Sequence, residues 1–236
     1  TLTRSEANTL KPGFNLIGNP YPSYLDWVKV CNYSTDGGVT KPNQVAMATT
    51  TMWYRTKVAL NTDPVTYEYQ FWTVNGIGEA SPATASQYIP PMQAFWVRAN
   101  TSNTPLILNN DMRMHAPTSN YLLKSPAIEN EKNQRLRLQV SNGIKTDETL
   151  IYFNSNAADG FDVYDSPKMN NEDTSSPEIY SKVDNEQFVI NGMSSIPLGK
   201  EIRLGVVGEN ATPLCIKANE ISNISPDIRI ILKDNI

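Results

Sequence analysis

Residues 135–140 have the sequence Arg135-Leu136-Arg137-Leu138-Gln139-Val140, in which polar and apolar side chains alternate strictly. Successive side chains of a β-strand point to opposite faces of the sheet, so this pattern predicts a strand buried on one face. Residues 227–230 alternate in the same way and predict a strand over 228–232. The other apolar segments of this half are also short: 149–153, 187–190, 201–207 and 213–217. About seven short strands in roughly 120 residues are typical of an immunoglobulin-like sandwich.

The preceding part of the chain has the same character. It predicts strands over 13–17, 51–59, 66–74, 87–98 and 104–108, with Pro90-Pro91 breaking the fourth. Ser23-Tyr24-Leu25-Asp26 fits a capping box and predicts one short helix that ends before residues 36–38. A long stretch with helical periodicity is absent from the sequence. The fold class expected is therefore all-β, with one short helix.

Composition divides the chain in two. Residues 1–116 contain all four tryptophans and 14 of the 21 aromatic residues, with 8 Lys+Arg against 7 Asp+Glu. Residues 117–236 contain 12 Lys+Arg against 17 Asp+Glu. This shift predicts two β-sandwich domains, an aromatic-rich one over 1–116 and an acidic, immunoglobulin-like one over 117–236. The boundary is expected near residues 112–124, and the interface is expected to be substantial.

Charge and rare residues argue against several chemistries. The net charge is −4 without a basic stripe, which excludes a nucleic-acid binder, and the sequence has no apolar run of the length that spans a membrane. His115 is the one histidine, and no nucleophile motif accompanies it. Cys31 and Cys215 are too few for a zinc knuckle, and two buried reduced thiols are expected rather than a disulfide. We therefore expect a protein that is not an enzyme, although composition alone cannot exclude a glycosidase carboxylate pair.

Aromatic side chains of the first domain are the candidate ligand-binding residues. In Tyr67-Glu68-Tyr69-Gln70-Phe71-Trp72 the odd positions form an apolar face, which predicts that they are core and that Trp72 is exposed. By the same alternation Trp96 shares its face with Arg98 and is the second candidate. Tyr21 and Trp27 are further candidates for ligand contact, although their position after a strand and a stiff Pro-x-Pro turn favours packing against the sheet. The alternative for both Trp72 and Trp96 is coverage by a loop or the neighbouring domain.

An acidic segment of the second domain is the candidate metal site. Its oxygen-bearing side chains are those of Asn154, Asn156, Asp159, Asp162 and Asp165. Calcium takes six to eight oxygen ligands at flexible spacing, so calcium is the one cofactor considered. The spacing does not match an EF-hand loop. The alternative is a turn rich in Asn and Asp that is capped by Gly160.

Four stretches resemble a known group of modules. They are GFNLIGNPYPS at 13–23 with Asp26 and Trp27, IPPMQAFWV at 89–97, DETLIYF at 147–153, and ADGFD at 158–162 with Asp165. Together they resemble modules of large secreted and cell-surface proteins of Bacteroidetes-type bacteria, many of which are exported by type IX secretion. The resemblance implies adhesin-like β-sandwich domains, an extracellular or cell-surface location, and a role in adhesion or glycan handling.

Two functions remain open from the sequence. The first is a non-catalytic extracellular module pair of a larger surface or secreted protein, acting in adhesion or as a spacer. The alternative is a carbohydrate-binding module attached to an enzyme or a glycan-uptake protein. The partners expected are a host or microbial glycan, a surface protein, and neighbouring domains of the parent chain.

Overall fold

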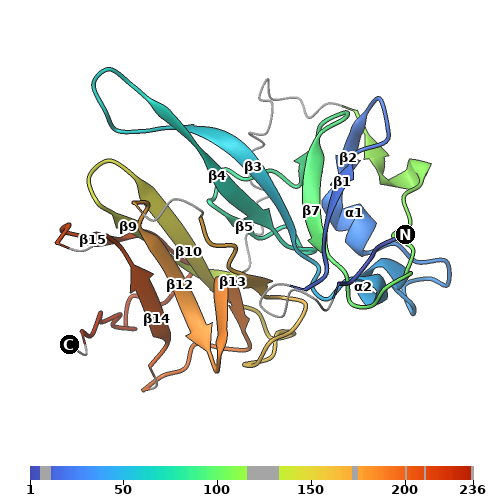
Figure 1. Cartoon of the computed structure of the whole chain (residues 1–236). Helices are drawn as coiled ribbons and strands as arrows, with labels where there is room; N and C mark the ends of the chain where they lie inside the picture. The colour runs from blue at the N-terminus through green and yellow to red at the C-terminus, as the bar shows by residue number, and fades with distance from the viewer. Residues whose placement is uncertain (6–11, 116–132, 172–174, 200, 210, 235–236) are drawn as a thin grey trace.

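In the computed structural model the chain is mostly β, with several sheets and few helices (Figure 1). The structure describes residues 1–5, 12–115, 133–171, 175–199, 201–209 and 211–234. We call residues 1–115 the first half and residues 133–234 the second half. The first half contains β1 (Phe14–Gly18), β2 (Tyr24–Asp26), α1 (Trp27–Cys31), α2 (Pro42–Ala46), β3 (Met52–Ala59), β4 (Tyr67–Val74), β5 (Ala80–Ser81), β6 (Tyr88–Ile89), β7 (Ala94–Arg98), the 3-10 helix η1 (Asn110–Met112) and β8 (Arg113–Met114).

The first half is built on an antiparallel five-stranded sheet in the order β1-β7-β3-β4-β5. A small sheet in the order β6-β2-β8 and the helix α1 cover one face of it. The core lies between them, where Trp27, Tyr54, Trp72 and Phe95 are buried together. The Trp27 indole donates a hydrogen bond to the Thr50 carbonyl (2.8 Å), so its polar atom is satisfied inside the core.

The second half is a single curved sheet. Its strands are β9 (Gln134–Ser141), β10 (Thr146–Phe153), β11 (Ser166–Pro167), β12 (Glu178–Val183), β13 (Glu186–Met193), β14 (Arg203–Val207) and β15 (Cys215–Ser222). The order is β14-β12-β13-β10-β9-β15, with β11 beside β13. The β10–β13 pair is parallel and the other pairs are antiparallel. Leu136, Val140 and Ile179 pack on one face, while Leu150 and Tyr152 face Ile77 of the first half.

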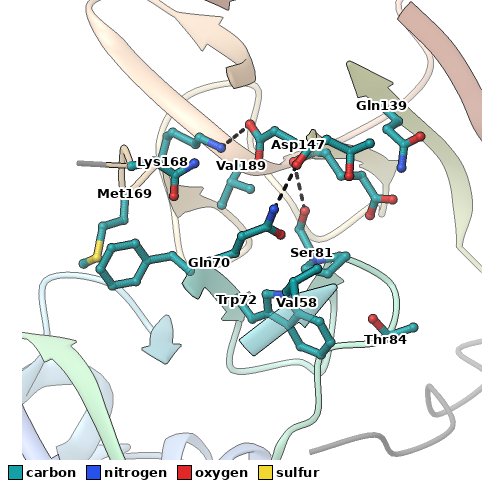
Figure 2. Close-up of a pocket in the computed structure, with 15 residues that line it drawn as sticks. Val58, Gln70, Trp72, Ser81, Thr84, Gln139, Asp147, Lys168, Met169 and Val189 are labelled. Carbon is teal, nitrogen blue, oxygen red and sulfur yellow. Dashed lines mark hydrogen bonds and ion pairs between the residues drawn. The ribbon is translucent and has the colours of Figure 1, made fainter. Parts of the chain in front are cut away.

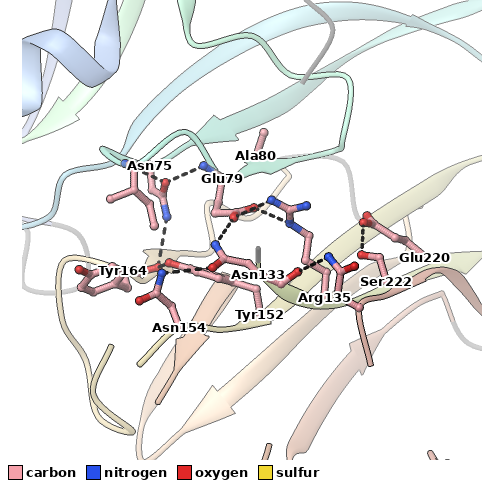
Figure 3. Close-up of polar contacts among 12 residues, drawn as sticks. Asn75, Glu79, Ala80, Asn133, Arg135, Tyr152, Asn154, Tyr164, Glu220 and Ser222 are labelled. Carbon is pink, nitrogen blue, oxygen red and sulfur yellow. Dashed lines mark hydrogen bonds and ion pairs between the residues drawn. The ribbon is translucent and has the colours of Figure 1, made fainter. Parts of the chain in front are cut away.

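A buried ion pair joins the two halves at the β4–β5 turn. Glu79 is 3% exposed, and Arg135 of β9 donates to both of its carboxylate oxygens, from Nε (3.1 Å) and Nη2 (3.0 Å). Asn133 donates to the same carboxylate (2.9 Å), as Figure 3 shows. A second cluster lies beside it, where Arg137 contacts Glu148 (2.7 Å) and the Ala80 carbonyl (2.8 Å). The joint is therefore polar and densely hydrogen-bonded.

Hydrogen bonds at two further places extend this joint along the first sheet. Just before β3, the Thr50 hydroxyl donates to the Val163 carbonyl (2.8 Å), and at the start of β3 the Trp53 indole donates to the Pro167 carbonyl (3.2 Å). At the far end of the β3–β4 hairpin, Asn61 donates to the carbonyls of the β9–β10 turn, where the two hairpins lie together (Figure 1). Among the described residues, no strand of one half pairs with a strand of the other. Side chains rather than a shared sheet make the joint.

Most predicted strands are confirmed, and two are wrong. Pro90-Pro91 separates β6 from β7, as the sequence predicts. The strand predicted over 228–232 is absent: Ile231 is 80% exposed, and β15 occupies the place beside β9. Residues 104–108 form one bridge, between Thr104 and Leu2, rather than a strand. The predicted boundary near 112–124 lies mostly outside the described residues.

The helix prediction also needs correction. Ser23–Asp26 is not a helical first turn, because residues 24–26 form β2. Asp26 is itself the N-cap of α1 and accepts a hydrogen bond from the Val28 amide (3.0 Å), so the helix begins three residues later. The described residues also contain the second short helix α2, which begins at Pro42.

Cys31 is buried and Cys215 is exposed, both as free thiols, so the expectation of burial is wrong for Cys215.

Candidate functional site

The outward face of the first sheet carries aromatic rings beside cations. In the β3–β4 hairpin, Arg55 lies opposite Phe71 and Lys57 lies opposite Tyr69. Directly opposed residues of an antiparallel pair share one face, so these four side chains project to the same side. Tyr69 is 63% exposed and Tyr67, two residues before it, is 56% exposed. Large aromatic rings at this exposure leave flat apolar surface open to a ligand.

Two further strands extend this surface. Trp96 of β7 is half-buried and contacts Phe71 edge to face, with ring centroids 5.6 Å apart. Leu16 of β1 lies opposite Trp96 and is 60% exposed. We call this surface the aromatic face, formed by Leu16, Arg55, Lys57, Tyr67, Tyr69, Phe71 and Trp96.

Cation–π contacts hold the side chains of the aromatic face in place. The Arg55 guanidinium carbon lies 5.2 Å from the Phe71 ring centroid and 6.0 Å from that of Tyr69. The Lys57 ammonium lies 4.3 Å from the Tyr67 ring centroid. Such contacts contribute roughly 0.5–1 kcal/mol at exposed sites. They therefore orient the rings and place positive charge between them.

The second half closes one end of the aromatic face. Trp53 lies on the same side of the sheet, opposite Trp96, but it is fully buried. Its indole donates to the Pro167 carbonyl, and its ring contacts Phe14 at 5.2 Å between centroids. The open surface therefore extends from Trp96 towards the β3–β4 turn.

The prediction that Trp72 is exposed is wrong. The face of β4 predicted to be exposed is buried, and the face predicted to be core points outward. Trp72 is 7% exposed and packs against Tyr54, with centroids 6.1 Å apart. Tyr67, Tyr69 and Phe71, predicted to be core, are the outward residues instead. Alternation separates the two sets correctly. Which set is buried depends on where α1 and the small sheet dock, and they dock on the side of Trp72.

The other three aromatic candidates have different positions. Trp96 lies on the outward face, as predicted from its alternation with Phe95. Trp27 has no exposed surface and is a core residue, so a ligand-contact role for it is wrong. Tyr21 is half-buried against the core, with the Arg113 guanidinium carbon 5.2 Å from its ring centroid. Of the four candidates, Trp96 is the one that contributes to the aromatic face.

The acidic segment is a hydrogen-bonded turn. Asp162 accepts from the backbone amides of Ala158 (2.6 Å) and Tyr164 (2.7 Å). Further along, Asn154 accepts from the Asn156 amide, Asp159 accepts from Ser194, and Asp165 accepts from the Asp162 and Gly192 amides. In the part of the chain that the structure describes, no three Asp, Glu, His or Cys side chains are placed to hold one metal ion. The arrangement supports the Asx-rich turn and gives the calcium prediction no support.

Asp165 is the chemically unusual member of this turn. It is 2% exposed, and burial raises the pKa of its carboxyl from 3.8 to about 7, against the lowering effect of its two amide hydrogen bonds. A carboxyl whose pKa is raised by folding binds its proton more tightly in the folded state. Its contribution to stability is then fully present below about pH 4 and is lost as the pH rises through 7.

We therefore expect the free energy of unfolding to rise by up to about 4 kcal/mol between pH 8 and pH 4 through Asp165. Urea denaturation across that range measures it. Asp165→Asn should remove most of this slope, whereas Asp227→Asn, at an exposed position of the second half, should leave it intact. An unchanged slope in Asp165→Asn would contradict the assignment.

A cleft between the halves is the second candidate site (Figure 2). Its volume is about 200 Å³, and it contains Gln70, Trp72, Ser81, Asp147 and Lys168 among its lining residues. Lys168 forms an ion pair with Asp147, Gln70 donates to the Thr146 carbonyl (3.3 Å), and Ser81 donates to the Glu148 carbonyl (3.1 Å). The Gln70 and Ser81 hydrogen bonds cross the joint, and the Lys168–Asp147 pair lies within the second half beside them. The cleft is therefore part of the connection between the halves, and the aromatic face is the better candidate for a ligand site.

Tyr67, Tyr69 and Phe71 are not among the site residues predicted from the sequence, because an apolar stripe along a strand predicts a core face. The signal that identifies them is in the hairpin partner. In β3, Arg55 and Lys57 point to the side of the strand opposite to residues 54, 56 and 58. Antiparallel pairing with β4 places these two cations on the same side of the sheet as Tyr69 and Phe71. A lysine and an arginine on one side of a strand indicate the solvent face.

A family model described as a domain of unknown function, DUF8693, matches residues 2–236, and the chain belongs to this family. Neither a curated protein nor a solved structure matches the chain. None of the helices in the described residues has the length and apolar character needed to cross a bilayer.

Proposed function

We propose that the chain is a non-catalytic carbohydrate-binding module that contacts its ligand through the aromatic face. The observation that carries this proposal is the row of rings, Tyr67, Tyr69, Phe71 and Trp96, on one outward sheet surface. A pyranose ring presents a flat patch of C–H groups, which stacks on an aromatic ring, and hydroxyl groups at its rim. A planar aromatic surface supplies the stacking partner at little cost in conformational entropy.

The location and role proposed follow from the same surface and from the sequence. We propose an adhesin-like module of a larger secreted or cell-surface protein of a Bacteroidetes-type bacterium, with type IX secretion as its export route. The resemblance of residues 13–23 and 89–97 to such modules supports this. We further propose two β-sandwich domains, the second immunoglobulin-like, with the two ends of its one curved sheet, β14 and β15, folded over a shared apolar cluster. The absence of a strand pair across the joint among the described residues supports a division into two units.

A spacer is the second candidate function, and the joint favours it. The Glu79–Arg135 ion pair connects the halves through buried charge, and Arg137 adds a hydrogen bond to the Ala80 carbonyl, which suits a module that holds neighbouring domains at a set distance. A spacer needs no ligand. Retention of carbohydrate by the aromatic face therefore separates the two functions.

Truncating a ring of the aromatic face is expected to weaken glycan binding about tenfold or more, because exposed aromatic anchors dominate such contacts. The experiment measures binding to immobilised bacterial, host and plant polysaccharides for the wild-type chain, Tyr69→Ala and Trp96→Ala. Phe161→Ala is the matched control, since Phe161 is an aromatic residue of the second half that is 48% exposed.

Unchanged binding in both face variants would contradict the proposed site. A wild-type chain that binds no polysaccharide would favour the spacer instead. Urea denaturation of each variant shows that a loss of binding does not result from unfolding.

A further inference from the structure

One of the three buried tryptophans has no acceptor for its indole N–H. Trp27 and Trp53 donate to the backbone carbonyls of Thr50 (2.8 Å) and Pro167 (3.2 Å). Trp72 is 7% exposed, and its enclosed indole nitrogen has no hydrogen-bond partner among the described residues. A buried donor without a partner costs roughly 1–3 kcal/mol, and buried tryptophans usually avoid that cost. The Trp72 N–H is therefore in place for an acceptor that the described residues do not supply.

The cleft between the halves brings this indole opposite a buried lysine. Figure 2 shows Trp72 on one side of the cleft and Lys168 with Asp147 on the other. The Lys168 side chain is 4% exposed, and its ammonium contacts one acceptor, the Oδ2 atom of Asp147. An ammonium has three N–H donors, so two of them lack an acceptor in the part of the chain that the structure describes.

Asp147 supplies the complementary acceptor. Its Oδ2 atom accepts from Lys168 and from the Ile179 amide (2.8 Å), whereas its Oδ1 atom accepts from no donor among the described residues. The cleft wall therefore carries one unpartnered N–H from Trp72, two from Lys168, and a carboxylate oxygen beside them. A molecule that fits these groups must both accept and donate hydrogen bonds.

The charges of the cleft favour a neutral molecule over an anion. Lys168 is matched by Asp147, and the second carboxylate of the lining, Glu148, is matched by Arg137 (2.7 Å). An anion would add negative charge beside two carboxylates whose counterions are already in place. A hydroxyl group carries no charge, accepts one hydrogen bond and donates another, so it can pair with either kind of group.

The cleft has room for one ring that carries hydroxyl groups. Its volume is about 200 Å³, and a cavity of about 150 Å³ accommodates a benzene ring. Val58, Met169 and Val189 supply apolar surface to the lining. Thr84 and Thr146 also line the cleft and are exposed, so it opens to solvent at these residues.

We propose that the cleft binds one neutral sugar ring, a monosaccharide or a cyclic polyol of that size. Its hydroxyl oxygens accept hydrogen bonds from Trp72 and Lys168, and one hydroxyl donates to Asp147. This site is additional to the aromatic face, because neither Tyr67 nor Tyr69 lines the cleft. Since Trp72 belongs to the first half and the other two residues to the second, the bound sugar connects the halves.

The indole N–H signal of Trp72 in a heteronuclear NMR spectrum reports on this site directly. The probes titrated into the full chain are glucose, galactose, mannose and myo-inositol, with glucuronate and inorganic phosphate as anionic comparisons. At least one neutral probe is expected to shift the Trp72 signal with a Kd of about 1 mM. The Trp27 signal should stay in place, because its N–H is already paired.

Two variants test the proposed contacts. Trp72→Phe keeps a ring and removes the N–H, so the affinity, followed through the side-chain amide signals of Gln70, should fall about fivefold. Thr84→Trp fills the mouth of the cleft from an exposed position and should abolish binding with little change in stability. Trp96→Phe makes the same substitution on the aromatic face and is the matched control, with wild-type affinity expected.

Each outcome bears on the proposal. A Trp72 signal that no neutral probe shifts would overturn it and leave water as the occupant of the cleft. Binding that persists unchanged in Thr84→Trp would place the sugar elsewhere, and tighter binding of glucuronate or phosphate than of every neutral probe would overturn the ligand class. The proposed function is tested separately, because Tyr69→Ala should weaken polysaccharide binding and leave monosaccharide binding in the cleft unchanged.

Discussion

Trp27→Ala is expected to lower the free energy of unfolding by about 4 kcal/mol, because it removes the largest fully buried side chain of α1. The indole contacts Phe95 edge to face at 5.6 Å between centroids and donates to the Thr50 carbonyl. Alanine leaves a cavity between α1 and the first sheet, and it leaves that carbonyl without its partner. Urea denaturation followed by circular dichroism measures the change.

Two further variants make this result interpretable. Trp27→Phe keeps a ring in the core but lacks the indole N–H, and it should cost roughly 1–3 kcal/mol. Tyr69→Ala removes an exposed ring and should change stability by less than about 0.5 kcal/mol. A Trp27→Ala variant as stable as Tyr69→Ala would contradict the assignment of Trp27 to the core. The comparison separates aromatic residues that hold the fold from those available to a ligand.

Breaking the Glu79–Arg135 pair is the second large effect expected. Glu79→Gln should lower the free energy of unfolding by about 3–5 kcal/mol, because Arg135 then keeps its charge in a largely buried site without a counterion. Glu79→Leu combined with Arg135→Leu should recover much of the loss, since no charge remains at the joint. Denaturation of Glu79→Leu, Arg135→Leu, the double variant and the wild type completes a double-mutant cycle.

The exposed pair Lys233–Glu201 is the matched control for this experiment. Glu201→Gln should leave stability nearly unchanged, because solvent screens an exposed pair. If Glu79→Gln cost no more than Glu201→Gln, the joint would not depend on buried charge. A large coupling energy in the cycle would instead show that the two halves stabilise each other.

The joint also bears on the aromatic face. Pro167 covers Trp53 at the closed end of that face, so the second half sets where the open surface begins. The proposed ligand surface and the connection between the halves are therefore parts of one arrangement. This is why the spacer and binding functions share structural features and need a binding measurement to separate them.

Alternation allowed much of the fold to be predicted from sequence. Residues 135–140 lie within β9, and residues 149–153 lie within β10, because local patterning of apolar side chains follows the pleat of a strand. The same reasoning failed at 228–232. A strand needs a neighbouring strand for its backbone hydrogen bonds, and the pattern within one segment does not show whether a sheet edge is free to pair with it. Here β15 already pairs with the edge of β9.

Alternation along residues 67–72 is enough to assign the side chains of β4 to two faces, with Tyr67, Tyr69 and Phe71 on one and Trp72 on the other. The sequence by itself also determined that Asn154 to Asp165 is rich in turn-forming side chains. Which face of β4 meets the core was decided by tertiary structure alone, because both faces carry large aromatic rings and burial favours either. The docking of α1 and the small sheet places Trp72 inside and leaves three rings beside Arg55 and Lys57, and this choice creates the candidate site.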